Sequence, residues 1–236
     1  GTRPVLYARA SGLPDAPVFR IIQDATGALF VGTERGVYRR SGERFVPASP
    51  LLPNDGVPSL ARDATGNLWI GTVNNGLLRL ADADVEKHTS PRGLPNNRVA
   101  ALLVDREGSI WAGTNAGLLR LSDAPFSTIN GDQGLSDDYV RALAESRDGS
   151  LWIGTSRGLN RWRGGRLEAS HTAADGLPGD SVLSLLEDRD GSLLVGSYTD
   201  GLLRLRDGKL IAQYDNAHGM PGSNQVRALA QQDDGT

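Results

Sequence analysis

"GNLWIGTVNNGLLRL", residues 66–80, is an apolar run that ends at Gly-Thr and is followed by a turn and a second apolar run. The same string returns along the chain as "GALFVGTERGVYRR" at 27–40, "GSIWAGTNAGLLRL" at 108–121, "GSLWIGTSRGLNRW" at 149–162 and "GSLLVGSYTDGLLRL" at 191–205. A string with five copies is a unit of construction. Any function must therefore be sought in what differs between the copies.

Two independent landmarks keep the same period. The central aromatic position is occupied by Phe30, Trp69, Trp111, Trp152 and Leu194, with steps of 39, 42, 41 and 42 residues. A Gly-Leu-Pro landmark or a close variant occurs at 12–14, 51–53, 93–95, 134–136, 176–178 and 219–221, with steps of 39, 42, 41, 42 and 43 residues. A shared period of this length indicates a repeat architecture.

Each period predicts four short strands. After the Gly-Leu-Pro landmark, Val57, Leu60 and Asp63 mark a first strand and the start of a turn. The continuous apolar "LWIGT" run predicts a second strand that is buried on both faces. The alternating "GLLRL" run predicts a third strand, and the variable, more polar segment that follows predicts a fourth. Polarity increases along the period, as expected if each strand lies farther from a central axis.

Four strands per period predict an all-β fold, a β-propeller of four-stranded blades. We expect a single propeller domain, or a fragment of a larger propeller, over residues 1–236. The expected complete repeats are five, at about 15–53, 54–95, 96–136, 137–178 and 179–221, with partial blade strands at 1–14 and 222–236. Gly-Thr stops and enrichment in Val, Ile and Trp argue against helical repeats, and a β-solenoid needs a shorter period.

The two ends leave the closure of the ring open. "NQVRALAQQDDGT" at 224–236 begins a sixth unit, and "VLYARA" at 5–10 stands where the outermost strand of a preceding blade belongs. Either the chain is a fragment of a longer propeller, which we favour, or "VLYARA" moves inward and pairs with 226–232.

Two repeated side-chain types are expected to be structural. Trp69, Trp111 and Trp152 should stack between blades, because burial of large aromatic rings is a main source of core stability. The repeated acids are expected to cap their own Asp-x-x-Gly turns rather than bind calcium, and these acids are Asp24, Asp63, Asp105 and Asp188. Each turn should close on a glycine with positive φ, as at Gly66 and Gly108.

The unit "GLPxxxVxxLxxDxxGxLWIGTxxGLxR" resembles the two-component regulator propeller repeat. Residues 93–120, "GLPNNRVAALLVDREGSIWAGTNAGLLR", match it almost position for position, and the resemblance covers about 12–235. Three features that recur in register make it specific, namely the Gly-Leu-Pro landmark, the Asp-x-x-Gly turn and the Trp-x-Gly-Thr strand. Ser146 in place of the turn Asp, and Leu194 with Ser197 in the fifth copy, depart from the pattern, so we expect those blades to be less regular.

The resemblance implies a periplasmic sensory region of a membrane-spanning bacterial signalling protein, a hybrid histidine kinase or a diguanylate cyclase. Its implied partners are adjacent propeller or signalling domains of the same polypeptide. The composition excludes other classes: with a net charge of −3 and scattered basic residues, no nucleic-acid surface is expected. No apolar run is long enough to insert into a membrane, and the lack of cysteine excludes disulfides and thiolate metal sites.

No catalytic constellation is found, so we expect a protein that is not an enzyme and needs no cofactor or metal. His88 and His171 lie in the same register two blades apart, where we expect exposed positions on outer strands, too far apart to share a metal. A propeller lyase similar to the streptogramin lyases would need a His and acidic residues near the axis. A protein-interaction scaffold, the other alternative, would need an apolar or aromatic patch on one rim, whereas the variable segments are mixed and polar.

The variable loops are the candidate binding surface. The loop that leads into each inner strand and the loop between the second and third strands should emerge on the same face. Their Asn, Asp, Arg and Tyr side chains suit a polar small molecule or a glycan, bound by amide hydrogen bonds and ring stacking. The candidate residues are Asn96, Asn97, Asp138, Tyr139, Arg157, Tyr198 and Asp200. At any one position, the alternative is that Asn and Asp are good turn residues.

Overall fold

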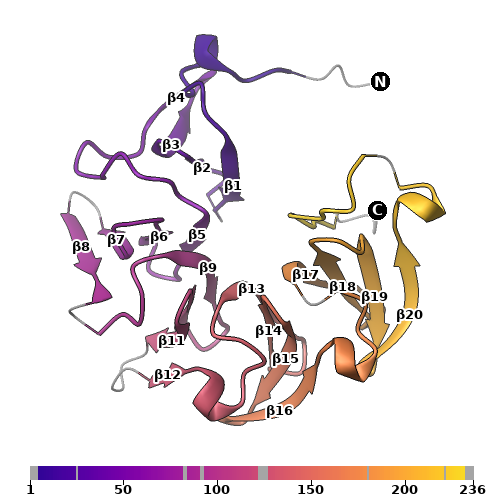
Figure 1. Ribbon diagram of the computed structural model, residues 1–236. Helices are drawn as coiled ribbons and strands as arrows, with labels where there is room; N and C mark the ends of the chain where they lie inside the picture. The colour runs from indigo at the N-terminus through magenta and orange to yellow at the C-terminus, as the bar shows by residue number, and fades with distance from the viewer. Residues whose placement is uncertain are drawn as a thin grey trace.

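The computed structural model describes residues 5–24, 26–81, 84–90, 93–121, 127–179, 181–220 and 222–231. These residues form five four-stranded antiparallel sheets, arranged around a common axis as the blades of a β-propeller (Figure 1). Within each sheet the strands follow sequence order from the axis outward. The expected all-β propeller class is confirmed.

The blades are numbered 1 to 5 in chain order. Blade 1 contains β1 (Val18–Gln23), β2 (Leu29–Thr33), β3 (Gly36–Ser41) and β4 (Arg44–Pro47). Blade 2 contains β5 (Ser59–Arg62), β6 (Leu68–Gly71), β7 (Leu77–Ala81) and β8 (Asp84–His88). Blade 3 contains β9 (Val99–Val104), β10 (Ile110–Thr114), β11 (Gly117–Leu121) and β12 (Ser127–Ile129).

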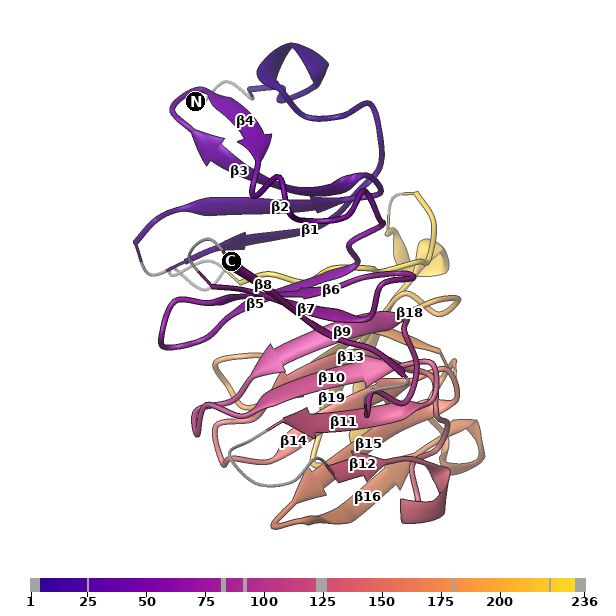
Figure 2. The same ribbon diagram turned by 90° about the vertical axis from the view of Figure 1, so that its left-hand side faces the viewer.

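Blade 4 contains β13 (Val140–Glu145), β14 (Leu151–Thr155), β15 (Gly158–Arg163) and β16 (Arg166–His171). Blade 5 contains β17 (Val182–Glu187), β18 (Leu193–Ser197), β19 (Leu202–Arg206) and β20 (Lys209–Tyr214). Single turns of 3-10 helix lie in the connections, at η1 (Arg9–Ser11), η3 (Gly131–Gln133), η4 (Ala173–Asp175) and η5 (Asn216–His218). The blades stack face to face along the arc (Figure 2).

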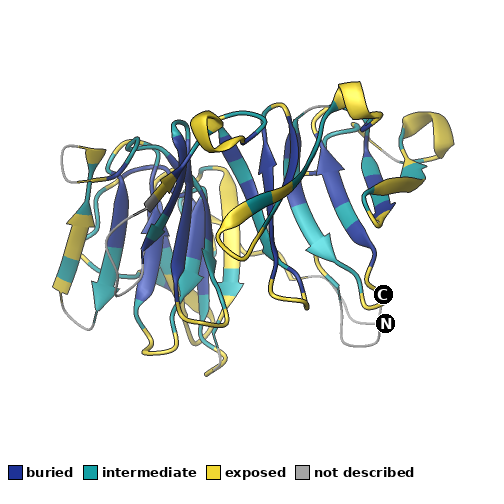
Figure 3. Cartoon of the chain, turned by 90° about the horizontal axis from the view of Figure 1, so that it is seen from below, coloured by how far each residue is buried: buried dark blue, intermediate teal, exposed yellow. Residues whose placement is uncertain are grey.

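The second strand of each blade is the most deeply buried. Every residue of β10 and of β14 is buried, as predicted for the "LWIGT" run. Burial decreases toward the outer strands and the loops (Figure 3). The glycine of "LWIGT" allows the next blade to approach, because a Cβ added at Gly154 would lie 2.4 Å from Cγ1 of Val182. The threonine closes the following turn, where Thr114 Oγ1 donates to the carbonyl of Gly117 at 2.7 Å.

The tryptophans lie between blades, as predicted. Trp111 of blade 3 is only 5% exposed and packs against Val140 and Leu151 of blade 4. Its Nε1 donates to Oδ2 of Asp105 at 2.7 Å, so the ring also links the strand to the preceding turn.

The Asp-x-x-Gly turns are capped by their own aspartates in the first three blades. Asp63 Oδ1 accepts from the backbone N–H of Thr65 and of Asn67, and Asp24 and Asp105 accept from equivalent residues. The turn glycines, including Gly66, have positive φ.

Asp188 caps its turn only in part: its Oδ1 accepts from the backbone N–H of Arg189 at 2.6 Å, and its carboxylate also binds the guanidinium of Arg204 and the side chain of Gln231. Asp190 also caps this turn, and its Oδ1 accepts from the backbone N–H of Ser192.

Blades 4 and 5 are less regular than blades 1 to 3 between their third and fourth strands, as expected, although away from Ser146, Leu194 and Ser197. The register shifts there between Arg161 and Trp162 and between Arg204 and Leu205, whereas the corresponding pairs of blades 1 to 3 show no shift among their described residues. Their inner strands show the same register shift as β1, two residues after the strand begins. In the turn of blade 4, Oδ1 of Asp148 accepts from the backbone N–H of Ser150 and so replaces the missing turn aspartate.

The two ends of the described chain do not pair with each other. Tyr7, in the "VLYARA" segment, packs edge-on against Phe45 of β4, with ring centroids 5.5 Å apart. At the other end, the N–H of Val226 donates to the carbonyl of Ser197, as the N–H of Val99 does to that of Thr72. Residues 224–231 thus follow the path of a next inner strand. That the chain is a single propeller domain or a fragment of a larger propeller stays a prediction. Residues 1–4 and 232–236 lie outside the described residues.

Candidate functional site

The two predicted sets of loops meet on one face of the arc. In blade 4 the N–H of Ser156 donates to the carbonyl of Tyr139, and in blade 5 the N–H of Tyr198 donates to that of Ser181. Because neighbouring strands are antiparallel, the Asp-x-x-Gly turns emerge on the opposite side. We call the first side the connecting-loop face. Its segments are 34–35, 51–58, 73–75, 93–98, 115–116, 134–139, 156–157, 176–179, 198–200 and 222–225.

A buried carboxylate holds part of this face together. Asp55, 7% exposed, accepts from the backbone N–H groups of Gly56, Asn74 and Asn75 and from both of those amide side chains, at 2.8–3.0 Å. Burial raises the pKa of Asp55, but these hydrogen bonds outweigh it and lower the pKa below its usual 3.8. Asp55 therefore stays ionised and fixes the loops of blade 2.

Four of the seven candidate residues use polar atoms within the loops. Oδ1 of Asn96 accepts from the N–H of Arg98, and Oδ1 of Asn97 accepts from that of Ser90, both at 2.8 Å. Oδ1 of Asp138 accepts from the N–H of Gly131 at 2.7 Å, and Oδ2 of Asp200 accepts from the hydroxyl of Thr199. These side chains shape the loops, which is the turn role of Asn and Asp.

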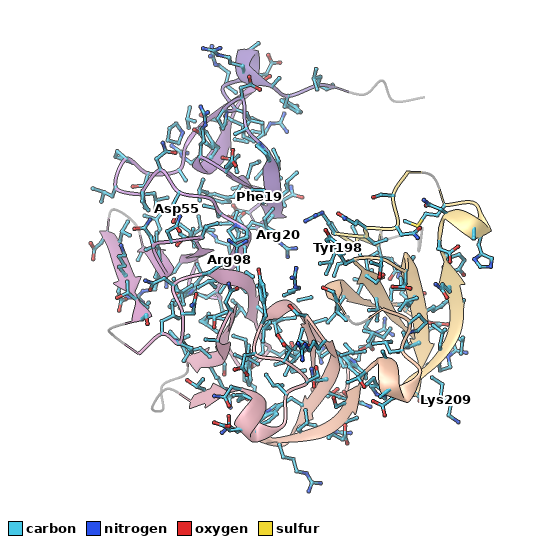
Figure 4. The ribbon with its side chains drawn as sticks, in the orientation of Figure 1. Phe19, Arg20, Asp55, Arg98, Tyr198 and Lys209 are labelled. Atoms are coloured by element: carbon cyan, nitrogen blue, oxygen red, sulfur yellow. The ribbon has the colours of Figure 1, made fainter. Side chains whose placement is uncertain are left out.

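Of the other three candidates, Arg157 and Tyr198 face solvent, whereas Tyr139 is half-buried. The side chain of Arg157 is 77% exposed and lies 3.6 Å from Asp137. Tyr198, labelled in Figure 4, lies on blade 5. It is 45% exposed. The ring of Tyr139 lies under the guanidinium of Arg141, with 4.3 Å between Cζ and the ring centroid. That the seven residues bind a ligand stays a prediction.

A cavity of about 600 Å³ lies along the axis, where the inner strands converge. Its lining consists of 18–21, 58–59, 100–102, 141–143, 183–186 and 227–230. Most of these residues are apolar or small, and the charged ones are Arg20, Arg141 and Arg227. Phe19 and Arg20 lie at this central opening (Figure 4). We call this cavity the central channel.

Our sequence reasoning missed the channel arginines, although a signal was present. When the repeats are aligned on the valine that begins each inner strand, the following residue is different in almost every copy. These residues are Phe19, Pro58, Ala100, Arg141, Leu183 and Arg227, and all of them line the channel. Variation at one position inside an otherwise repeated strand therefore marked the axis.

The histidines lie away from the channel, but two of them are not exposed as predicted. His88 and His171 end the outer strands β8 and β16, and both are half-buried. His88 stacks on Trp69 with ring centroids 5.9 Å apart, because the outer strand folds over the interblade tryptophan. Burial is the main cause that lowers the pKa of His88. Among the described residues, no group of three or more His, Cys, Asp or Glu could hold a metal ion.

Four segments match the two component regulator propeller family, at residues 51–74, 93–116, 134–157 and 176–199. Each segment runs from the landmark before an inner strand to the loop between the second and third strands. Comparison with curated proteins gives no match. No helix in the described part of the chain is long and apolar enough to cross a membrane.

Solved structures share the fold. The extracellular domain of a hybrid two component system from B. thetaiotaomicron has a TM-score of 0.81 and 22% identity, over 95% of this chain and 32% of that one. A second such domain from the same organism has a TM-score of 0.70 and 20% identity, over 95% and 37%. A catalytically inactive His-to-Ala variant of virginiamycin B lyase from Staphylococcus aureus, with quinupristin, has a TM-score of 0.66 and 13% identity, over 86% and 71%.

At these identities the solved structures show the fold alone, and the chain spans about a third of the length of the two hybrid-system domains. The repeat matches are more specific, because they coincide with blades 2 to 5 in register. The chain therefore belongs to the family of proteins built from two-component regulator propeller repeats.

Proposed function

We propose that this chain is a non-catalytic sensory propeller of a bacterial transmembrane signalling protein, and that it detects a polar small molecule or a glycan. The observation that carries the proposal is the connecting-loop face, on which two loops of a blade meet, together with a channel of about 600 Å³ between the inner strands. A cavity of that volume lies in the usual range for small-molecule sites.

The contrast between scaffold and loops supports this proposal. The strands repeat in sequence and register, so they offer every blade the same backbone. The loops differ, and they present Arg157 and Tyr198 to solvent on a rigid support. Specific binding residues are commonly carried on loops that a rigid scaffold positions.

The family and the two extracellular hybrid-system domains support a place outside the inner membrane, in the periplasm. On this proposal, the partners of the chain are adjacent propeller or signalling domains of the same polypeptide. Ligand binding would change how the blades pack against those domains, since a ligand shifts an equilibrium by its differential affinity for two states.

The enzyme alternative is disfavoured by where the histidines lie. A His-to-Ala variant of the structurally similar virginiamycin B lyase is catalytically inactive. Here His88 and His171 end outer strands, and His218 lies in η5, paired with Asp215 at 2.7 Å. None of the three lines the central channel. We therefore propose binding without turnover.

A thermal-shift screen against oligosaccharides, amino acids and small anions tests the proposal. A ligand at a hundredfold excess over its dissociation constant stabilises the fold by about 2.7 kcal/mol. We expect at least one compound to raise the Tm, and Arg157→Ala and Asn97→Ala to reduce that rise. Arg166→Ala, on the exposed outer strand β16, is the matched control. A panel without any stabilising compound, or a rise that both loop variants retain, contradicts the proposal.

A further inference from the structure

The charge of the central channel is of one sign. Arg20, Arg141 and Arg227 are its charged lining residues, and no Asp or Glu is among the described residues that line it. The whole chain carries 28 acidic against 25 basic residues, so carboxylates are not scarce. Their absence from the channel is therefore a local property.

Arginines on the blade faces differ from the channel arginines because they form ion pairs. Arg62, Arg161 and Arg204 each lie within 2.6–2.9 Å of an aspartate. In the described part of the chain, none of the three channel arginines forms an ion pair; Arg227 only donates to the side chain of Gln225, at 2.8 Å. Three unpaired guanidinium groups around one cavity form a site of positive potential.

Arg141 is the best positioned of the three. Its Nε donates to Ser156 Oγ at 3.0 Å, and its guanidinium stacks on the ring of Tyr139. These two contacts hold the plane of the guanidinium at the connecting-loop face. No acceptor for its Nη atoms lies among the described residues, so a pair of parallel N–H donors is free. Such a pair matches the two oxygens of a carboxylate or phosphate.

Arg20 occupies a position where the other blades carry small residues. The equivalent residues are Ser59, Ala101, Ala142 and Ser184. Ser59 shows why small residues suit this position, since its Oγ donates to the carbonyl of Val99 in the next blade. Arg20 is open to solvent inside the channel and still surrounded by enough protein that burial lowers its pKa.

A fourth arginine lies on the connecting-loop face, outside the lining of the channel. Arg98 immediately precedes Val99, the first residue of the inner strand β9, and its Nε is buried without a hydrogen-bond partner. Figure 4 places Arg98 beside the central opening. A buried guanidinium nitrogen without an acceptor is costly unless a ligand or water supplies one.

We infer that the mouth of the central channel binds an anionic ligand, a small molecule whose carboxylate, sulfate or phosphate group contacts Arg141, with Arg20 and Arg227 on the surrounding wall. The inference rests on the proposed function and narrows its ligand to acidic compounds, such as a uronic acid among the sugars. The apolar walls lower the local dielectric constant and so strengthen each ion pair.

Titration calorimetry and thermal shift with citrate, inorganic phosphate, glucuronate and glucose test this inference. Glucuronate and glucose differ at one carbon, a carboxylate against a hydroxymethyl group, so they isolate the charge. We expect at least one anion to bind and to raise the Tm, more strongly at low salt, and glucose not to do so. Binding of phosphate alone assigns a phosphate ester, whereas binding of citrate or glucuronate assigns a carboxylate.

Three arginine variants localise the effect. Arg141→Gln should weaken anion binding about 10-fold or more, and Arg141→Lys should weaken it less, because lysine keeps the charge but loses the paired donors. Arg166→Gln, outside the channel, should leave binding unchanged. A loss of anion binding in Arg166→Gln as large as that in Arg141→Gln overturns the inference, and so does the absence of binding by any of the anions. A neutral ligand that needs Arg157 but not Arg141 would refute the inference and leave the proposed function standing.

Discussion

Replacement of Trp111 by alanine should weaken the contact between blades 3 and 4. The ring is 5% exposed and fills the space between the two sheets, against Val140 and Leu151. Truncation of a buried tryptophan costs about 3–5 kcal/mol, because it removes apolar contacts and leaves a cavity that the sheets cannot close. For a chain of this length the expected fall in Tm is about 6–20 °C.

The hydrogen bond of the ring can be separated from its packing. Trp111→Phe keeps an aromatic ring but leaves Oδ2 of Asp105 without its indole donor. We expect this variant to lose about 1–3 kcal/mol, because the half-buried carboxylate of Asp105 loses its indole donor. Trp162→Ala is the matched control, because Trp162 is only half-buried and should cost less.

Thermal and urea unfolding followed by far-ultraviolet circular dichroism measure these differences without relying on tryptophan fluorescence. An unchanged Tm for Trp111→Ala, especially together with lost ligand binding, would refute the structural role of this residue. A loss in Trp162→Ala as large as that in Trp111→Ala would refute the argument from burial.

Three further perturbations test other parts of the account. Asp55→Ala should lower the free energy of unfolding by about 1–3 kcal/mol in urea titrations, because buried N–H donors lose their acceptor, whereas exposed Asn54→Ala should be near neutral; equal values would contradict the role of Asp55. Burial raises the pKa of Asp63, but hydrogen bonds outweigh it and lower the pKa from 3.8 to about 2, so the stability from this carboxylate is present above about pH 4 and lost as the pH falls toward 2. Asp63→Asn should flatten that fall in acid unfolding curves, and an identical curve would argue against the assignment. Gly154→Ala should lower the Tm, since its Cβ would lie 2.4 Å from Val182, and an unchanged Tm would show that the blades can separate at no cost.

The parts of the fold that could be predicted from the sequence are those that every repeat contains. The repeat period predicts where the strands lie along the chain. Trp111 and Gly113 identify the second strand of the repeat as the one that packs against the next blade. The turn at Asp63 could be predicted because its carboxylate accepts hydrogen bonds from backbone N–H groups only two and four positions later. These are local relations, so they can be derived from spacing alone.

What the repeat pattern does not contain could not be predicted in the same way. Asp188 binds Arg204 and Gln231, a contact that depends on how a distant segment crosses blade 5. His88 is half-buried because the outer strand folds over Trp69. The carboxylate of Asp138 and the amide oxygen of Asn97 each accept a hydrogen bond from a backbone N–H seven residues earlier in the chain. Such partners are fixed by loop conformation, which composition does not specify.

The channel arginines illustrate a third limit. Arg20, Arg141 and Arg227 are separated by 121 and 86 positions in the chain. Only the circular arrangement of the inner strands brings them to one cavity. The loops were predicted to bind ligand because they vary in sequence between repeats. The position after the inner-strand valine varies as much, and it lies closer to the axis.

Hydrogen–deuterium exchange in the presence of the most stabilising compound of the screen tests most directly whether the connecting-loop face is the sensing surface. We predict slower exchange at 96–98, 137–139 and 156–157 on that face. Exchange should be unchanged in the opposite turns, at 63–66 and 105–108. Protection confined to those Asp-x-x-Gly turns, with no change on the connecting-loop face, would contradict the account.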